Sequence, residues 1–509
     1  MSLDTLKQRF KFSKKEFLYF ILIISFAIVL RVWDLGMVGF NNDEAIYSGQ
    51  AGTLAGKEEF ENHFSIFRAH PLLLQSIVSI MIGIFGVSDT VSRIAPAVLG
   101  ILTIIFTYMI GKTLFETKMA MISAIVLTIL PYHILLSRQV LLDVSLSFFY
   151  ILTLYFLVRH LKNPKNALWV YLVGASAGLS FISKEVGIFA LISSIVCLFL
   201  IRTISFRNVL IVIASFLLAS SPYWLPILTI PEAHENAVKY WNWQKTRDPN
   251  QPHLFYATIL SQEALGYVLT GLCVISTVYA LRTGNIKKPE IFMLLVWIAV
   301  PLILFHFLAV KGFAFVLPII PAFVLLGISF LFSDWVKKMH GHRILILGII
   351  PLIFVFSGHP LHYVMQIPPI DLVGSGEDPY AKNGAMWIKD NVPQAGKFLT
   401  LDIRTANIIK YYSNNEVFSL HANENPAYTE IENPDLPILN GEIDYLVYEI
   451  YLAERFGYLQ EEQDELTELI IKYDGTPVHT EYETYVDQNG HSSKRPALVI
   501  YSLNRIEEN

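Results

Sequence analysis

The most constraining feature of this chain is a nearly unbroken series of apolar runs between residues 93 and 358. Short polar links separate the runs. Backbone polar groups inside a bilayer must bond to one another, so such runs predict membrane-spanning helices. A mean hydropathy of +0.47 and a charged fraction of only 16% agree with this interpretation. The sequence therefore predicts an integral membrane protein rather than a series of soluble domains.

A first span is expected before this series. The residues up to Glu16 are basic, and the apolar run 17–30 that follows has no small-residue cleavage site. We interpret this run as a retained helix with a cytoplasmic N-terminus. About eleven spans are expected, at residues 17–30, 93–111, 119–136, 143–158, 168–183, 186–201, 208–225, 255–281, 291–308, 312–332 and 343–358. With this count the basic links fall in the cytoplasm, as the positive-inside rule requires.

The apolar segment Leu72–Gly86 is left out of this count. If it crossed the membrane fully, every later link would change sides and the basic links would face outward. We therefore expect this segment to lie in the outer leaflet. A twelfth span is the alternative.

The charge distribution divides the chain into two expected domains. Residues 371–509 carry 25 acidic and 10 basic side chains, whereas residues 1–370 carry 18 and 28. We expect a polytopic α-helical membrane domain over 1–370, with a first outer loop at 31–71, and an extracytoplasmic soluble α/β domain over 371–509. Within the latter, a helix is predicted at 378–389 and strands at 397–401, 445–448 and 497–501. No stripe of Arg and Lys with interleaved aromatics is present, so no nucleic acid partner is expected.

Charged side chains gather at the outer ends of the expected spans. Ionisable groups at membrane depth are costly and by default mark a functional path. The acids are Asp43, Glu44 and Asp143, and the cations are Arg68, His70, Arg138, Lys184 and Lys311. A pump or channel would place charged residues in the middle of several helices, whereas no expected span here has an acid near its centre.

Several short motifs around these residues occur in a familiar order. They are Asp43-Glu44-Ala-Ile-Tyr47, Arg68-Ala-His70-Pro71-Leu72, Ser92-Arg93-Ile-Ala-Pro96, Ser137-Arg138 before Asp143, Lys184-Glu185-Val-Gly187, and Lys311 before Pro318 and Pro321. The ordered set resembles the GT-C glycosyltransferases, above all the dolichyl-phosphate-mannose–protein mannosyltransferases and the bacterial lipid A aminoarabinose transferases. The family usually has His-Pro-Pro-Leu where this chain has His70-Pro71-Leu72-Leu73, so the geometry of that loop can differ.

The resemblance implies a mannosyltransferase-like enzyme of the cell membrane. Its donor would be a sugar linked to dolichyl or undecaprenyl phosphate, and its acceptor a hydroxyl on protein, lipid or glycan at the outer face. Such a transfer needs a base for the acceptor proton and cations for the departing phosphate. The family's base matches Asp43, with Glu44 orienting it or exchanging roles with it and Asp143 as a second acid. Arg68, His70, Arg138, Lys184 and Lys311 are the candidates for binding the phosphate.

Structural interpretations of the same residues stay open. The Asp43–Glu44 pair can cap a helix, Arg138 and Asp143 can form an interfacial salt bridge, and Lys184 and Lys311 can anchor helices at the interface.

Two other functions are alternatives. An oligosaccharyltransferase-like enzyme would carry a Trp-Trp-Asp signature near its C-terminus, where this chain has only Trp387. A secondary transporter would show repeated halves, which are not visible. No cofactor is certain, and a divalent metal stays open, as do the sugar and the acceptor.

Overall fold

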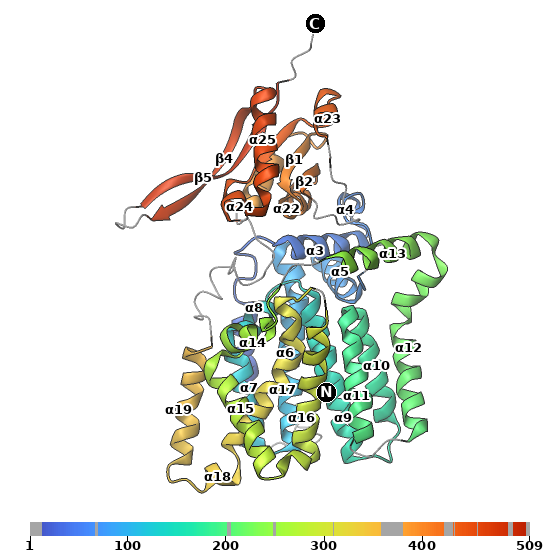
Figure 1. Ribbon diagram of the computed structural model, residues 1–509, viewed down its shortest axis with the longest axis vertical. Coiled ribbons are helices and arrows are strands. Elements are labelled where there is room, and N and C mark those ends of the chain that lie inside the picture. The colour runs from blue at the N-terminus through green and yellow to red at the C-terminus, as the bar shows by residue number, and fades with distance from the viewer. Residues whose placement is uncertain are drawn as a thin grey trace.

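The protein consists of a helical bundle, a layer of helices across one end of the bundle, and a small sheet domain beyond that layer (Figure 1). The computed structural model describes residues 13–66, 70–200, 205–247, 251–308, 310–357, 380–421, 431, 433–455, 457–486 and 492–504. Arg68 and the residues around the expected domain boundary at 370/371 lie outside these ranges.

The bundle contains most of the apolar runs. Its helices are α2 (Lys14–Val32), α6 (Asp89–Leu114), α7 (Thr117–Ile129), α8 (Pro131–Ser137), α9 (Leu142–Lys162), α10 (Leu168–Ser183), α11 (Ile188–Leu200), α12 (Phe206–Thr229), α15 (Gly266–Arg282), α16 (Pro289–His306), α17 (Ile320–Leu331) and α19 (His342–Val355). One apolar cluster, which includes the fully buried Trp297, runs through the bundle. The 3₁₀ segments η1 (Glu185–Gly187), η3 (Asn285–Lys287) and η4 (Phe313–Ile319) and the short helix α18 (Asp334–Lys337) connect these helices.

The multi-pass class is confirmed, but a count of eleven spans is not. Among the described residues, five helices are long and apolar enough to cross a membrane, and two bent pairs raise the number to seven. The remaining apolar helices include α10 and α19, which are shorter than a full crossing requires. Hydrophobic runs predict where helices lie, whereas the number that cross depends on helix length and bending.

The run expected as one span at 255–281 is broken. It forms α14 (Phe255–Thr258), the π-helical η2 (Ile259–Ala264) and then α15 after a bend of 117°. Gly266 at the bend has a φ of +70°, and a Cβ there would lie 1.9 Å from the carbonyl oxygen of Phe356. Only glycine fits this close approach, so a single straight helix is excluded here.

The run expected at 119–136 also bends, by 62° between α7 and α8. Arg31 on α2 is fully buried at this break and donates to the carbonyl oxygens of Thr128 at 3.2 Å and Leu127 at 3.3 Å. The guanidinium thus satisfies carbonyls that the end of α7 leaves free.

A layer formed by α3 (Asn42–Leu54), α4 (Glu58–Glu61), α5 (Leu73–Phe85) and α13 (Pro231–Thr246) covers one end of the bundle (Figure 1). Helix α5 buries Leu74, Val78 and Ile82, spaced four residues apart, and exposes Ile80 and Ile84. This two-sided apolar character at the end of the bundle suits the expected position of residues 72–86 in one leaflet.

The C-terminal domain is built on a five-stranded sheet of order β2-β1-β3-β5-β4. The strands are β1 (Lys397–Asp402), β2 (Glu416–His421), β3 (Tyr445–Tyr448), β4 (Thr476–Val486) and β5 (Ser492–Ser502). Strand β1 is parallel to β2 and β3, and β5 is antiparallel to β3 and β4. The sequence predicted β1, β3 and β5 but missed β2 and β4.

The helices of this domain that the structure describes are α21 (Ala381–Asn391), α22 (Ile403–Ser413), α23 (Asp435–Leu439), α24 (Ile450–Arg455), the 3₁₀ helix η5 (Gly457–Leu459) and α25 (Gln460–Lys472). One apolar cluster joins α21 and α22 to the sheet, and a second contains residues of α25. The helix expected at 378–389 is α21, of which the described part begins at Ala381.

The domain packs directly on the helix layer through α22. Phe40 and Phe64 of the first outer loop share an apolar cluster with Tyr411 and Tyr412 of α22. The Tyr412 hydroxyl donates to Asp89 at 2.9 Å and accepts from the Phe40 N–H at 2.8 Å. The layer and the sheet domain therefore form one packed unit above the bundle.

Candidate active site

The start of α3 presents Asp43 and buries Glu44. The Asn41 side chain accepts from the Glu44 N–H at 2.9 Å, and the Glu44 carboxylate accepts from the Asn41 N–H at 3.4 Å. This capping box fixes the first turn of the helix. Asp43, one residue earlier, is half-buried, and its carboxylate accepts from Asn42 Nδ2 at 3.4 Å. The capping interpretation therefore applies to Glu44, whereas Asp43 stays accessible.

Glu44 is fully engaged by protein groups. Its carboxylate accepts from Arg93 Nε at 2.7 Å and Arg93 Nη2 at 2.6 Å. The Glu44 side chain is 1% exposed and the Arg93 side chain 6%. It also accepts from the Val140 N–H at 2.9 Å. Arg93 donates in turn to the carbonyl oxygen of Leu35 at 2.7 Å. The pair joins α3, α6, the α8–α9 link and the first outer loop.

Asp143, at the start of α9, pairs with Lys184, at the end of α10. Lys184 Nζ lies 3.0 Å and 2.8 Å from the two carboxylate oxygens, and both side chains are largely buried. The ammonium also lies 4.2 Å from the centre of the Phe315 ring on η4. The salt bridge considered between Arg138 and Asp143 is wrong, because Asp143 binds Lys184 instead.

These groups surround Asp43 electrostatically. The pKa of Asp43 is raised above its ordinary value, chiefly because burial disfavours the charged carboxylate. Lys184 and His70 act in the opposite direction, and Asp143 and Glu44 raise the pKa of Asp43 further. Asp43 is thus close enough to Asp143, Lys184 and His70 for their charges to affect it, and we call these four residues the cluster.

His70 connects the cluster to Glu185 and Tyr240, two residues that the sequence analysis did not link to it. Its Nδ1 lies 3.0 Å from Glu185 Oε1, and its Nε2 lies 2.8 Å from the Tyr240 hydroxyl on α13. Gln244 Nε2 donates to the same hydroxyl at 2.7 Å. Glu185 was visible as part of the Lys184–Gly187 motif, but Tyr240 comes from a polar loop with no motif of its own.

Two of the expected phosphate-binding cations have other contacts. Arg138 donates to the carbonyl oxygens of Trp33 at 2.8 Å and Leu30 at 3.2 Å, so it caps the end of α2. The backbone of Lys311 is bonded to the Gln251 side chain, by its N–H at 2.5 Å and its carbonyl oxygen at 2.7 Å. These two hydrogen bonds fix the position of the Lys311 backbone, just before η4. Arg68 lies outside the described residues.

Metal ligands do not gather at this end of the protein. In the described ranges, no three His, Cys, Asp or Glu side chains form a group that could bind a metal ion. His63, the other histidine of this loop, has its Nε2 3.3 Å from the carbonyl oxygen of Asn414 in the C-terminal domain.

Comparisons with known proteins point to one class. Residues 69–225 match the family described as Dolichyl-phosphate-mannose-protein mannosyltransferase. An uncharacterized protein of Aquifex aeolicus (strain VF5) is 24% identical over 345 residues, 64% of this chain and 67% of the relative. ArnT from Cupriavidus metallidurans bound to undecaprenyl phosphate matches in structure with a TM-score of 0.70 and 15% identity, covering 96% of this chain and 98% of that chain.

The Archaeoglobus fulgidus oligosaccharyltransferase in complex with Zn and sulfate also matches, with a TM-score of 0.61 and 14% identity, over 96% of this chain and 73% of that chain. The fold is therefore one that both transferases share. The resemblance to the GT-C superfamily, expected from the ordered motifs, is confirmed.

Proposed function

We propose that this GT-C membrane protein is a glycosyltransferase that moves a sugar from a polyprenyl-phosphate donor to an acceptor hydroxyl, in the manner of the mannosyltransferases. The observation that carries the proposal is an accessible carboxylate, Asp43, at the start of α3, within electrostatic range of the buried Asp143–Lys184 ion pair. The polyprenyl phosphate bound by the similar ArnT structure and the mannosyltransferase family match support the donor class.

The proposed reaction is one displacement at the anomeric carbon. The acceptor oxygen forms a bond to that carbon while the bond from the carbon to the phosphate oxygen breaks. The acceptor proton passes to Asp43, and the polyprenyl phosphate leaves with the bonding electrons. A carboxylate whose pKa is raised is a stronger base than an ordinary aspartate, which suits the transfer of a hydroxyl proton.

The leaving phosphate gains negative charge, and fixed cations stabilise it in a site that excludes water. Lys184 is directed into the cluster by Asp143 and Phe315. Lys311 lies two residues before the η4 segment that supplies Phe315, and His70 is oriented by Glu185 and Tyr240. We assign Asp143 the role of positioning Lys184, and Glu44 the role of positioning α3.

The test is the Asp43→Asn variant, with Glu59→Gln, an exposed change in the same outer loop, as the control. Loss of the base should lower the rate of sugar transfer by about 10²–10⁴-fold. Binding of the lipid-linked donor should persist in Asp43→Asn, and Glu59→Gln should behave as wild type. Near-normal turnover by Asp43→Asn would reject Asp43 as the base.

The same assay separates the alternatives. Transfer to hydroxyl acceptors supports the proposal, whereas transfer of an oligosaccharide to an asparagine peptide would favour the oligosaccharyltransferase-like function. The shared fold covers 96% of the chain and favours a transferase over a transporter. Adding a chelator to the wild-type reaction tests for a divalent metal.

A further inference from the structure

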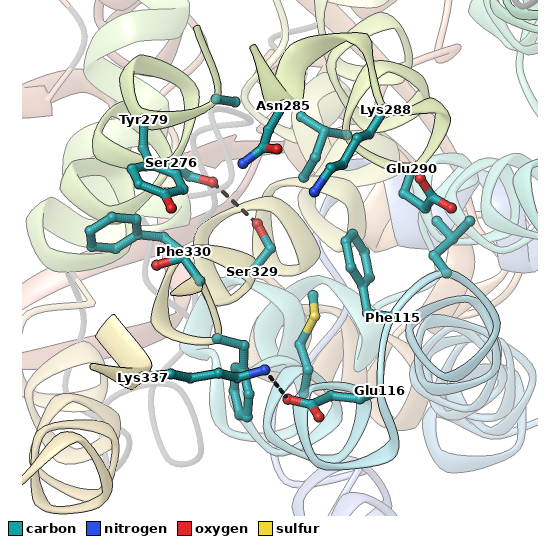
Figure 2. Close-up of a pocket in the computed structure, with 16 residues that line it drawn as sticks. Phe115, Glu116, Ser276, Tyr279, Asn285, Lys288, Glu290, Ser329, Phe330 and Lys337 are labelled. Carbon is teal, nitrogen blue, oxygen red and sulfur yellow. Dashed lines mark hydrogen bonds and ion pairs between the residues drawn. The ribbon is translucent and has the colours of Figure 1, made fainter. Parts of the chain in front are cut away.

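A cavity with both polar and apolar walls lies at the opposite end of the bundle from Asp43. It has a volume of about 430 Å³ and is bounded by the α6–α7 link, the α15–α16 link and the end of α17 (Figure 2). Arg93, which binds Glu44, and Leu114, which lines the cavity, are both on α6. Leu114 follows Arg93 by 21 positions, which at a rise of 1.5 Å per residue is about 32 Å along the helix. The cavity is therefore separate from the candidate active site.

One lysine of the cavity lining has no carboxylate partner among the described residues. Lys337 pairs with Glu116 at 3.3 Å, and Glu290 pairs with Lys162 at 3.5 Å. Among the described residues, Lys288 is a lining cation that no carboxylate binds. Figure 2 shows its ammonium group directed into the cavity, beside the Asn285 amide.

Neutral hydrogen-bonding groups line the rest of the polar side. The Ser276 and Ser329 hydroxyls lie 3.2 Å apart across the cavity wall. The Tyr279 side chain lies beside Ser276 (Figure 2). The Ser329 hydroxyl donates to the carbonyl oxygen of Leu326 at 2.7 Å, so the Ser276 hydroxyl donates to Ser329. The Tyr279 hydroxyl and the Asn285 amide are the lining groups that can donate to the oxygens of an anion that Lys288 attracts.

Aromatic residues of the kind that favour the membrane interface lie beside the cavity. Tyr279 packs edge-on against Phe330, and Phe330 stacks on Trp335, with ring centres 5.7 Å and 5.8 Å apart. Tyrosine and tryptophan favour the membrane–water interface. Leu114, Phe115, Met119, Ile291 and Phe332 form an apolar wall of the cavity, against which an acyl chain can lie.

We propose that this cavity binds the phosphate of an anionic phospholipid, with Lys288 as its main contact. Basic pockets between membrane helices are sites for anionic head groups. The charge of Lys288, the adjacent donors and the apolar wall of the cavity match the three parts of such a lipid: phosphate, glycerol oxygens and acyl chain. A free phosphate ion would use the first two but not the third.

The experiment uses the full chain in nanodiscs of phosphatidylcholine that contain phosphatidylglycerol. Native mass spectrometry counts the phosphatidylglycerol retained by wild type, Lys288→Gln, Lys288→Arg and Lys287→Gln. One lysine near the surface is worth about 1 kcal/mol, so Lys288→Gln should weaken retention about fivefold. Lys288→Arg should retain the lipid. Lys287→Gln, which removes the same charge one residue away and outside the cavity lining, should match wild type.

Equal retention by all four proteins, or an equal loss in Lys287→Gln, would overturn the site. Displacement of phosphatidylglycerol by inorganic phosphate at millimolar concentration would overturn the lipid in favour of a soluble anion. Because the readout is binding, neither result depends on the proposed transferase activity.

Discussion

At the scale of single residues, Asp43 and Glu44 differ in what their carboxylates contact. Glu44 is enclosed by Arg93 and backbone donors, whereas Asp43 is half-buried among charges and has no ion pair in the described part of the chain. The sequence motif presents the two acids as equals. Only the fold distinguishes them, because the distinction depends on Arg93 and Val140, which are distant in sequence.

The raised pKa of Asp43 predicts the pH dependence of transfer. The base acts only when ionised, so activity should fall on acidification at a pH above the ordinary aspartate value of about 3.9. Lys184 lowers the pKa of Asp43, so Lys184→Ala should move this fall to still higher pH. The measurement is the pH profile of kcat/KM, with Lys311→Ala as the control that leaves the position of the fall unchanged. A profile that Lys184→Ala does not shift would contradict the cluster.

The two lysines also predict an effect on donor use. Lys184→Ala and Lys311→Ala should each raise the apparent KM for the lipid-linked sugar, because each removes a cation from the leaving phosphate. We expect the larger effect for Lys311, because it directly precedes the expected span 312–332 with its Pro318 and Pro321. Steady-state kinetics over a range of donor concentrations measures this. If both variants keep wild-type kinetics, the phosphate is bound by other cations, with His70 the next to test.

At the scale of elements, the buried Glu44–Arg93 pair ties α3 to α6. Removing one partner of such a pair leaves an uncompensated charge and costs about 3–5 kcal/mol. Glu44→Gln and Arg93→Met should each lower the unfolding temperature markedly, and the double variant should lose less than the sum. A double-mutant cycle from thermal unfolding in detergent measures the coupling. Additive losses would show that the two side chains stabilise the protein independently.

The same scale shows what the sequence could and could not predict. Long apolar runs predicted nearly all bundle helices. Polar and charged side chains are excluded from the hydrocarbon, and this leaves a strong local signal in the sequence. The 117° bend before α15 was missed. The glycine at the bend, Gly266, is needed because the carbonyl oxygen of Phe356, ninety residues later, leaves no room for a Cβ. Strand β4 was missed because it is largely polar. The Asp143–Lys184 pair likewise joins residues whose partnership no spacing reveals.

At the scale of the whole molecule, the sheet domain and the candidate site lie at the same end of the bundle (Figure 1). We therefore expect both outside the cytoplasm, with the basic links inside. A reporter that is active only in the cytoplasm, fused after Asn509, should be silent, and one active only outside should work. The opposite result would show that the C-terminal domain lies in the cytoplasm and that α5 crosses the membrane fully.

The docking of α22 on the helix layer also has a consequence in time. Asp43 is synthesised early, but Tyr412, which bonds the loop leading into α3, follows about 370 residues later, or about 20–70 s at 5–20 residues per second. Throughout that interval the helix that carries the base lacks the surface it packs against. A chain still being made should thus be inert toward lipid-linked sugar, and activity should begin only when the last quarter of the protein has been delivered across the membrane.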